Sequence, residues 1–151
     1  MTYFDMDAEG FTRMKDMVEK GMETHRLSLC YFLLIDKTTS KVIGECGYHT
    51  LNISHQRAEL FYSLRNENDK RKGFMKEALK EVLAYGFNTI GLHRIEALTG
   101  AWNLASIGLL NHYGFTREGT MREDYVVNGV NENSECYSLL KWEWKKNNVP
   151  I

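Results

Sequence analysis

Proline, cysteine and long apolar runs are scarce in this sequence, and each shortage excludes a class of protein. The only proline is Pro150 and glycine is dispersed, so no linker, repeat or low-complexity tract divides the chain. We therefore expect a single domain over residues 1–151. The three cysteines, Cys30, Cys46 and Cys136, are too few for a disulfide framework, which favours a reducing, cytoplasmic compartment.

An excess of charge of one sign is also lacking. Lys and Arg total 19 and Asp and Glu total 20, a formal net charge of −1, so the composition does not indicate a nucleic-acid partner. No apolar run approaches the ~20 residues that cross a bilayer and no signal peptide opens the chain, so no membrane partner is expected. What is present is an apolar share of 43% and an aromatic share of 12%, which fits a packed globular core.

The hydrophobic periodicity predicts strands that alternate with helices. Apolar residues three and four apart predict helices over 7–24 and 74–90, and Asn103 is a candidate cap for a third helix over 103–113. The Asn128-Gly129 pair is a strong hairpin-turn signal between the last two strands. Strands are expected at 30–35, 42–51, 57–65, 93–99, 115–127 and 133–144. This order predicts an α/β fold with a mixed sheet and helices on its faces.

A basic loop suggests chemistry between the strand that ends near Arg65 and the helix that begins after Gly73. A glycine turn before a helix directs backbone N–H groups and partial positive charge outward, and so favours an anion such as a pyrophosphate. The cations that add to this charge are Lys70, Arg71, Lys72 and Lys76. The same pattern also fits a solvated basic loop. Neither GxGxxG nor GxxxxGK[ST] occurs, which disfavours dinucleotide and Walker-type sites.

Five sequence blocks, in order and suitably spaced, carry a family resemblance over roughly residues 30–145. They are Cys46-Gly-Tyr-His49; Ala58-Glu-Leu-Phe-Tyr-Ser-Leu64 with Arg71-Lys-Gly-Phe-Met-Lys-Glu-Ala-Leu79; Asn103-Leu-Ala-Ser106 with Tyr113-Gly-Phe115; Arg117-Glu-Gly-Thr-Met-Arg122; and Tyr137-Ser-Leu-Leu140. Together they resemble the GNAT N-acetyltransferases, and more narrowly the ribosomal-protein-alanine (Rim-type) branch. The resemblance implies a GNAT fold, with a mostly antiparallel mixed sheet and helices on both faces.

The resemblance also implies an enzyme that moves the acetyl group of acetyl-CoA to a primary amine. The leading acceptor is the N-terminal α-amine of a ribosomal protein. A small amine (polyamine, aminoglycoside or amino acid derivative) is the alternative within the family, and a non-catalytic CoA-binding module is the rival from another class. The partners expected are therefore acetyl-CoA and an amine acceptor.

Carried over residue by residue, the resemblance places the cosubstrate between the third and fourth strands. The residues expected to contact it are Leu64, Lys70, Arg71, Lys72, Gly73, Phe74, Met75, Lys76, Asn103 and Ser106. A backbone N–H around Leu64 is expected to polarise the thioester carbonyl. Asn103 is either a contact to the pantetheine arm or only a helix cap.

Three side chains are the candidates for catalysis. Glu59, a carboxylate between apolar neighbours, is the candidate general base, unless it pairs with a cation such as Arg57. His49 has a suitable intrinsic pKa and lies either in the acceptor site or in an ordinary sheet hydrogen bond. Ser106 is a candidate acid or sulfur contact, or else a surface hydroxyl. Many GNAT enzymes carry a tyrosine seven residues after the helix asparagine, and here that position is Leu110.

Two features depart from the family pattern, and a third argues against a metal site. Met75 stands where the family's loop usually ends in a small residue. The family's first strand is not found ahead of residues 7–24, so we expect either that the protein lacks this strand or that the start is truncated or misassigned. A missing strand leaves a sheet edge, which a loop or the partner chain of a homodimer is expected to cover. No metal site is expected, because Cys46 and His49 are three apart on a strand and face opposite sides of the sheet.

Overall fold

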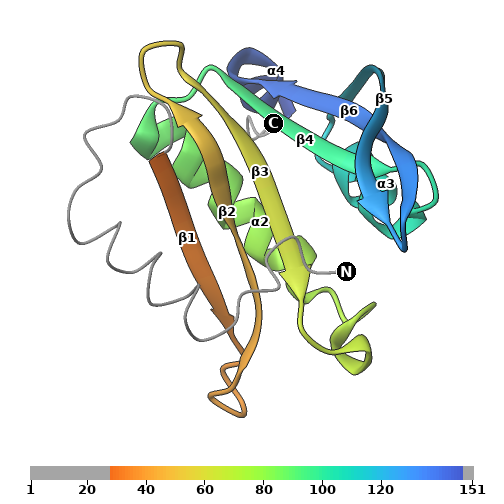
Figure 1. The fold of residues 1–151 in the computed structure, drawn as a ribbon. Coiled ribbons are helices and arrows are strands. Elements are labelled where there is room, and N and C mark those ends of the chain that lie inside the picture. The colour runs from red at the N-terminus through yellow and green to blue at the C-terminus, as the bar shows by residue number, and fades with distance from the viewer. Residues whose placement is uncertain (1–27, 148–151) are drawn as a thin grey trace.

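A six-stranded mixed sheet forms the framework of the computed structural model, which describes residues 28–147 (Figure 1). Its strands are β1 (Ser28–Ile35), β2 (Val42–Asn52), β3 (Arg57–Leu64), β4 (Arg94–Gly100), β5 (Thr116–Val127) and β6 (Val130–Leu140). Helices α2 (Phe74–Ala84), α3 (Leu104–His112) and α4 (Lys141–Asn147) accompany them, with the helical turns η1 (Glu67–Asp69) and η2 (Tyr85–Ile90). The strand order is β1-β2-β3-β4-β6-β5, and every neighbouring pair is antiparallel except β3 and β4. The predicted fold class is therefore confirmed.

One face of the sheet carries the hydrophobic core. Along β3, Ala58 and Leu60 are buried, and the helices cover them together with β4 residues Ile95 and Ala97. The Tyr48 hydroxyl on β2 donates a buried 2.7 Å hydrogen bond to a carbonyl of α2. Because alternate side chains of a strand point to opposite faces, Glu59 and its odd-numbered neighbours on β3 lie on the other face.

The predicted turns and caps are confirmed. Asn128 and Gly129 both have positive φ, 51° and 79°, and join β5 to β6 as a tight hairpin. The Asn103 side chain accepts a hydrogen bond from the Ser106 amide at 3.1 Å, which caps α3. Gly114, with φ 79°, ends the same helix.

Two predicted elements end differently. The helix expected over 74–90 changes after Ala84 into the π-helical turn η2. The strand expected over 133–144 runs from Val130 and stops at Leu140, because β4 begins at Arg94, the partner of Leu140, and offers no further ladder. Beyond this point the chain forms α4, whose Trp144 packs on the Phe87 ring with centroids 5.8 Å apart.

Some predictions fall outside the described residues. The helix expected over 7–24 and the strand expected to be missing ahead of it belong to this group. The expectation of helices on both faces depends on that first helix, since α2, α3 and α4 all contribute to the core described above. Strand β1 is an outer strand of the described sheet.

Gly86 in η2 leaves the space that the buried Tyr48 side chain occupies, so the effect of adding a side chain at Gly86 can be predicted. A Cβ at Gly86 would collide with the hydroxyl of Tyr48, which is itself fully buried. We expect Gly86→Ala to lower the free energy of unfolding by about 1–3 kcal/mol, measured by urea denaturation. The matched control is Gly108→Ala in α3, where a Cβ meets nothing within 4 Å. The control should stabilise the protein by about 0.5–1 kcal/mol, and equal effects would contradict the packing argument.

Candidate active site

Strands β3 and β4 diverge beyond a short stretch of parallel pairing (Figure 1). Within the described ladder, Arg57–Glu59 of β3 pair in parallel with Arg94–Glu96 of β4. Beyond these pairs lies a cavity of about 540 Å³, which is lined by parts of both strands, the start of α3 and the end of β5. The predicted residues that line it are His49, Glu59, Asn103 and Ser106.

The backbone of β3 presents N–H groups to this gap. The Arg65 amide donates to the Ile43 carbonyl on β2 at 2.9 Å. Because successive amides of a strand point to opposite sides, the Leu64 N–H points away from β2, towards β4. There it can donate to a carbonyl held in the gap, which is the role predicted for it.

Glu59 is a carboxyl group held in a poorly solvated position. Its side chain is 18% exposed. Burial, together with the smaller effect of the negative charges of Glu96 and Asp124, raises the pKa of Glu59 to about 7. The cation considered as its partner, Arg57, instead bonds Glu96 at 3.4 Å. Glu59 thus changes its charge close to neutral pH, as a general base requires.

His49 is the nearest ionisable neighbour of Glu59. Its Nε2 lies 3.5 Å from Glu59 Oε1, and its Nδ1 lies 2.9 Å from the Thr50 hydroxyl. The ring stacks on Phe61 with centroids 5.8 Å apart. Burial lowers the pKa of His49, which favours the neutral imidazole. The structure thus supports both interpretations of His49: it lies in the cavity and it is hydrogen-bonded.

Ser106 lies against a hydroxyl group of β3. Its Oγ is 2.5 Å from the Tyr62 hydroxyl oxygen, and both residues line the cavity. Ser106 is 9% exposed, so the interpretation as a surface hydroxyl is wrong. Leu110, at the position where relatives carry a tyrosine, is fully buried in the core.

The loop before α2 has the backbone expected of an anion site. Gly73, the N-cap of α2, has φ 85° and makes no side-chain cap, and the first helical bond runs from the Glu77 amide to its carbonyl. The helix therefore begins with free N–H groups. Two of the predicted cations lie in ion pairs: Lys70 with Glu67 at 2.5 Å and Lys72 with Asp69 at 3.4 Å. The geometry fits a pyrophosphate held mainly by backbone groups.

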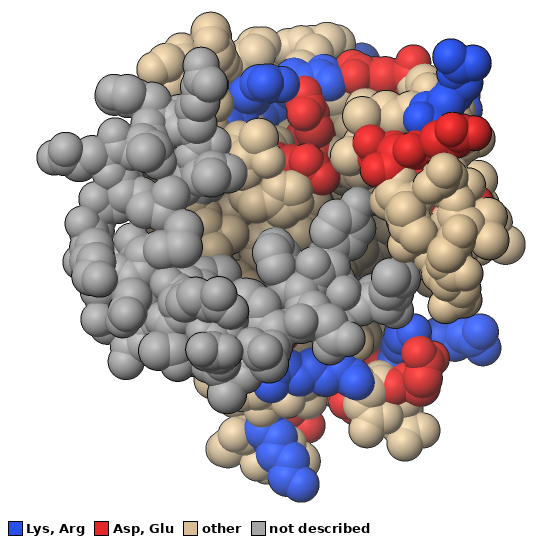
Figure 2. Space-filling view, viewed as in Figure 1, with Lys and Arg blue, Asp and Glu red and all other residues tan. Residues whose placement is uncertain are grey.

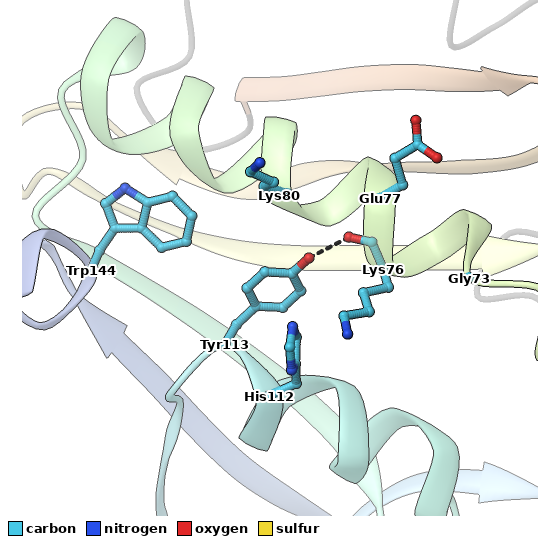
Figure 3. A pocket seen from close by; sticks show the side chains of 7 residues that line it. All are labelled: Gly73, Lys76, Glu77, Lys80, His112, Tyr113 and Trp144. Atoms are coloured by element: carbon cyan, nitrogen blue, oxygen red, sulfur yellow. Dashed lines mark hydrogen bonds between the residues drawn. The ribbon is translucent and has the colours of Figure 1, made fainter. Parts of the chain in front are cut away.

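A second cavity, of about 500 Å³, lies on the helical side of the same glycine (Figure 3). Gly73 and Lys76 border it from α2, and His112 and Tyr113 border it from the end of α3. The Tyr113 hydroxyl donates to the Lys76 carbonyl, so this tyrosine fastens α3 to the first turn of α2. Of the residues predicted to contact the cosubstrate, Gly73 and Lys76 thus line this second cavity, whereas Met75 is buried in the hydrophobic core.

The outer wall of the first cavity was not predicted. The Trp102 indole N–H donates to the Tyr125 hydroxyl at 3.0 Å, across Gly100. A bulge in β5 positions this wall: Met121 pairs with Ser134 and Tyr125 with Glu132, so extra residues of β5 oppose one residue of β6. No local sequence signal marks such a bulge.

Charged side chains on the visible face are intermixed in sign (Figure 2). On the sheet, the Arg94 guanidinium donates two hydrogen bonds to the Glu118 carboxylate, of 2.7 and 2.5 Å. This ion pair and a bond from Ser138 lower the pKa of Glu118 to about 2. Glu118 is therefore held by the sheet rather than directed at a ligand.

The described residues contain neither a cluster of metal ligands nor a helix that could span a membrane. No group of three or more His, Cys, Asp or Glu side chains among residues 28–147 is arranged to hold a metal ion. Cys46 is buried in the core while His49 lies in the cavity, as their spacing predicts. No helix in the described part is both long and apolar enough to span a membrane.

Comparison with known proteins gives the family. Residues 5–116 match the acetyltransferase (GNAT) domain. An uncharacterized N-acetyltransferase of Bacillus licheniformis is 39% identical over 113 residues, which cover 75% of this chain and 63% of the relative. The chain spans about six-tenths of the length of the first curated relatives that it matches.

Solved structures agree with this assignment. The ribosomal-protein-S5-alanine acetyltransferase from Vibrio fischeri superposes with a TM-score of 0.76 at 25% identity, covering 91% of this chain and 74% of that one. Mutant forms of the spermidine/spermine N-acetyltransferase SpeG from Vibrio cholerae share the fold, with a TM-score of 0.80 at 21% identity and coverages of 99% and 88%. The chain therefore belongs to the GNAT acetyltransferases, a family whose cosubstrate is acetyl-CoA.

Proposed function

We propose that this protein transfers the acetyl group of acetyl-CoA to the N-terminal α-amine of a protein, as a member of the Rim-type branch. In this proposal the N-terminus of α2 and Gly73 hold the pyrophosphate, and the Leu64 N–H polarises the thioester carbonyl. Glu59 accepts the proton of the attacking amine. Bound acetyl-CoA supplies the activated acyl group, and the protein supplies orientation and proton transfer.

The observation that carries the proposal is the position of the Glu59 carboxyl group, which lines the cleft with its side chain 18% exposed, where burial raises its pKa to about 7. An α-amine has a pKa of ~7.7–8.0, whereas a lysine-like amine has ~10.4. At neutral pH an α-amine therefore costs about 1 kcal/mol to deprotonate and a lysine-like amine about 4–5 kcal/mol. A carboxylate with a pKa of about 7 is suited to the first acceptor and is a weak base for the second.

The Rim-type assignment rests on the sequence blocks and on one structural likeness. The blocks around Glu59, Gly73 and Ser106 follow that branch in order and spacing. The solved neighbour at 25% identity is described as a ribosomal-protein-S5-alanine acetyltransferase. Both support a protein N-terminus, and a ribosomal protein in particular, as the acceptor.

A polyamine is the second candidate acceptor, and the cavity wall favours it in one respect. Trp102 and Tyr125 are aromatic, and Glu45 and Glu59 are acidic, a combination that suits a multiply charged amine. The fold shared with a spermidine/spermine N-acetyltransferase is consistent with this alternative. However, the Arg65 guanidinium lies 3.1 Å from the Glu45 carboxylate and offsets its charge.

An acceptor panel tests the proposal directly. The purified protein is incubated with acetyl-CoA and one acceptor at a time, and products are measured by mass spectrometry. The panel contains an alanine-initiated peptide with blocked lysines, the same peptide with a blocked N-terminus and free lysines, and spermidine. We expect kcat/KM for the first peptide to exceed the others by at least about tenfold. A preference for spermidine overturns the acceptor assignment, and CoA binding without any acetylation supports the non-catalytic module.

A further inference from the structure

Two hydroxyl groups from distant parts of the chain meet at the inner wall of the cleft. Tyr62 comes from β3, on the helix-covered face of the sheet, and Ser106 comes from the first turn of α3. Their oxygen atoms are 2.5 Å apart, and both side chains line the 540 Å³ cavity. The Ser106 backbone is itself fixed, because its amide donates to Asn103.

The pair lies close to the predicted carbonyl contact. Tyr62 precedes Leu64 by two residues on the same strand, and the same alternation directs the backbone N–H of both residues towards the gap. Glu59 lies on the opposite face of β3, three residues earlier. The cleft thus has an acceptor side with a base and a helix side with hydroxyl donors, and the predicted position of the carbonyl lies between them.

Acetyl transfer needs a donor on the helix side. The amine nitrogen forms a bond to the carbonyl carbon, the carbon–sulfur bond breaks, and the sulfur leaves with the electron pair as a thiolate. The proton of the amine goes to Glu59 and then to solvent, and the thiolate takes up a proton from solvent as CoA leaves. A hydrogen bond to the sulfur stabilises the charge that develops during the cleavage.

We propose that the Tyr62 hydroxyl donates this hydrogen bond to the leaving sulfur, while Ser106 orients it by donating to the Tyr62 oxygen. The inference rests on the proposed acetyl transfer and deepens it. It replaces Ser106 by Tyr62 as the group that contacts sulfur, and Ser106 becomes a positioning residue. The Ser106 and Tyr62 hydroxyls then form a chain in which each hydrogen bond strengthens the next.

The chemistry of the two side chains favours this order. Tyrosine is a far stronger hydrogen-bond donor and acid than serine, which does not serve as a general acid in typical sites. Burial raises the pKa of Tyr62 to about 12, so its hydroxyl retains its proton and remains a donor over the whole working range of an enzyme. The buried Leu110 offers no hydroxyl in its place.

The other tyrosines that line the two cavities, Tyr113 and Tyr125, either make a hydrogen bond at the second cavity or belong to the outer wall of the first. The Tyr113 hydroxyl donates to the Lys76 carbonyl at the second cavity. Tyr125 comes from the β5 bulge and accepts the Trp102 indole N–H, so it forms part of the outer wall. Tyr125 is nevertheless in the same cavity as Tyr62, and the experiment must compare the two.

The decisive measurement is the pKa of the thiol of CoA bound to the protein, which is determined from the ultraviolet absorbance of the thiolate. A donor aimed at sulfur stabilises the thiolate, so Tyr62→Phe should raise the pKa of the bound thiol by about 1 unit or more. Desulfo-CoA, which lacks the sulfur, should bind wild type and variant equally. We also expect kcat to fall on the order of 10²-fold, with KM for acetyl-CoA changed by no more than a few-fold.

Matched variants separate this inference from general damage. Tyr85→Phe removes a hydroxyl from η2, outside the cleft, and should change neither the pKa of the bound thiol nor kcat. Ser106→Ala should have a smaller effect than Tyr62→Phe, and the two effects should not add in the double variant. If Tyr62→Phe does not fold, difluorotyrosine at position 62 keeps the shape, strengthens the donor and should lower the pKa of the bound thiol.

Each outcome decides one question. An unchanged thiol pKa in Tyr62→Phe, or an unchanged thiol pKa with the difluorotyrosine protein, overturns the inference, and so does a larger effect from Tyr125→Phe. Failure of the wild-type protein to bind CoA overturns the proposed function instead. Normal CoA binding and a shifted thiol pKa without turnover support the sulfur contact and reject the proposed catalysis.

Discussion

Gly73→Asp is expected to abolish acetyl-CoA binding while the protein remains folded. The substitution places a carboxylate at the N-terminus of α2, where the pyrophosphate is proposed to lie. Two unit charges 4 Å apart repel by about 4 kcal/mol at an effective dielectric constant of 20, which corresponds to about a 10³-fold loss of affinity. Isothermal titration calorimetry with acetyl-CoA measures this loss.

The chain provides a matched control for backbone strain. Gly91 has φ 83°, nearly the same as the 85° of Gly73, and an added Cβ at either glycine meets nothing within 4 Å. In both Asp variants the left-handed conformation therefore lowers the free energy of unfolding by about 1 kcal/mol, and the two melting temperatures should fall by similar amounts. Only Gly73→Asp should lose the cosubstrate. A folded Gly73→Asp protein with unchanged affinity would remove the loop from the binding site.

Glu59→Gln is expected to lower the acetylation rate by about 10²–10⁴-fold at neutral pH, because glutamine keeps the shape but cannot accept a proton. In the wild type, kcat/KM should rise with pH as Glu59 loses its proton near its pKa of about 7. The pH profile of the Glu59→Gln variant should lack this rise in kcat/KM. Much of its activity on an α-amine should return at high pH, where the amine deprotonates unaided.

Thermal denaturation provides the control for Glu59→Gln. The pKa of Glu59 is about 7 in the folded protein and 4.5 ordinarily, so the folded state binds the proton more tightly. Its stabilising contribution is therefore present at acidic pH and is lost as pH rises towards neutrality. The Gln variant does not lose it, so it should match or exceed the stability of the wild type above neutral pH. Near-normal turnover at neutral pH would exclude Glu59 as the base and direct attention to His49 or water.

Local chemistry allowed much of the fold to be predicted. The Asn128-Gly129 turn and the Asn103 cap depend on residues adjacent in sequence, and both are confirmed. The end of β6 depends instead on the length of β4, a partner distant in sequence, and the wrong extension to residue 144 follows from that.

The candidate site was predicted only in part. Glu59 and Ser106 were found through the family blocks, and their proposed roles stay predictions. The Tyr62 hydroxyl was missed because its partner, Ser106, is 44 residues away, and only the divergence of β3 and β4 brings them together. Trp102 and Tyr125, 23 residues apart, meet through a bulge that has no local signature.

The short parallel ladder between β3 and β4 also has a consequence for the cooperativity of unfolding. It joins two halves of the sheet, β1–β3 and β4–β6, across the long crossover of residues 65–93. Pairing within β1–β3 closes short loops, whereas joining the halves closes the crossover at a higher entropic cost. The boundary between the halves is also the wall of the cleft. A ligand that contacts both halves of the sheet and is present at 100 times its Kd stabilises the folded state by about 2.7 kcal/mol. Such a ligand should make the two halves unfold together.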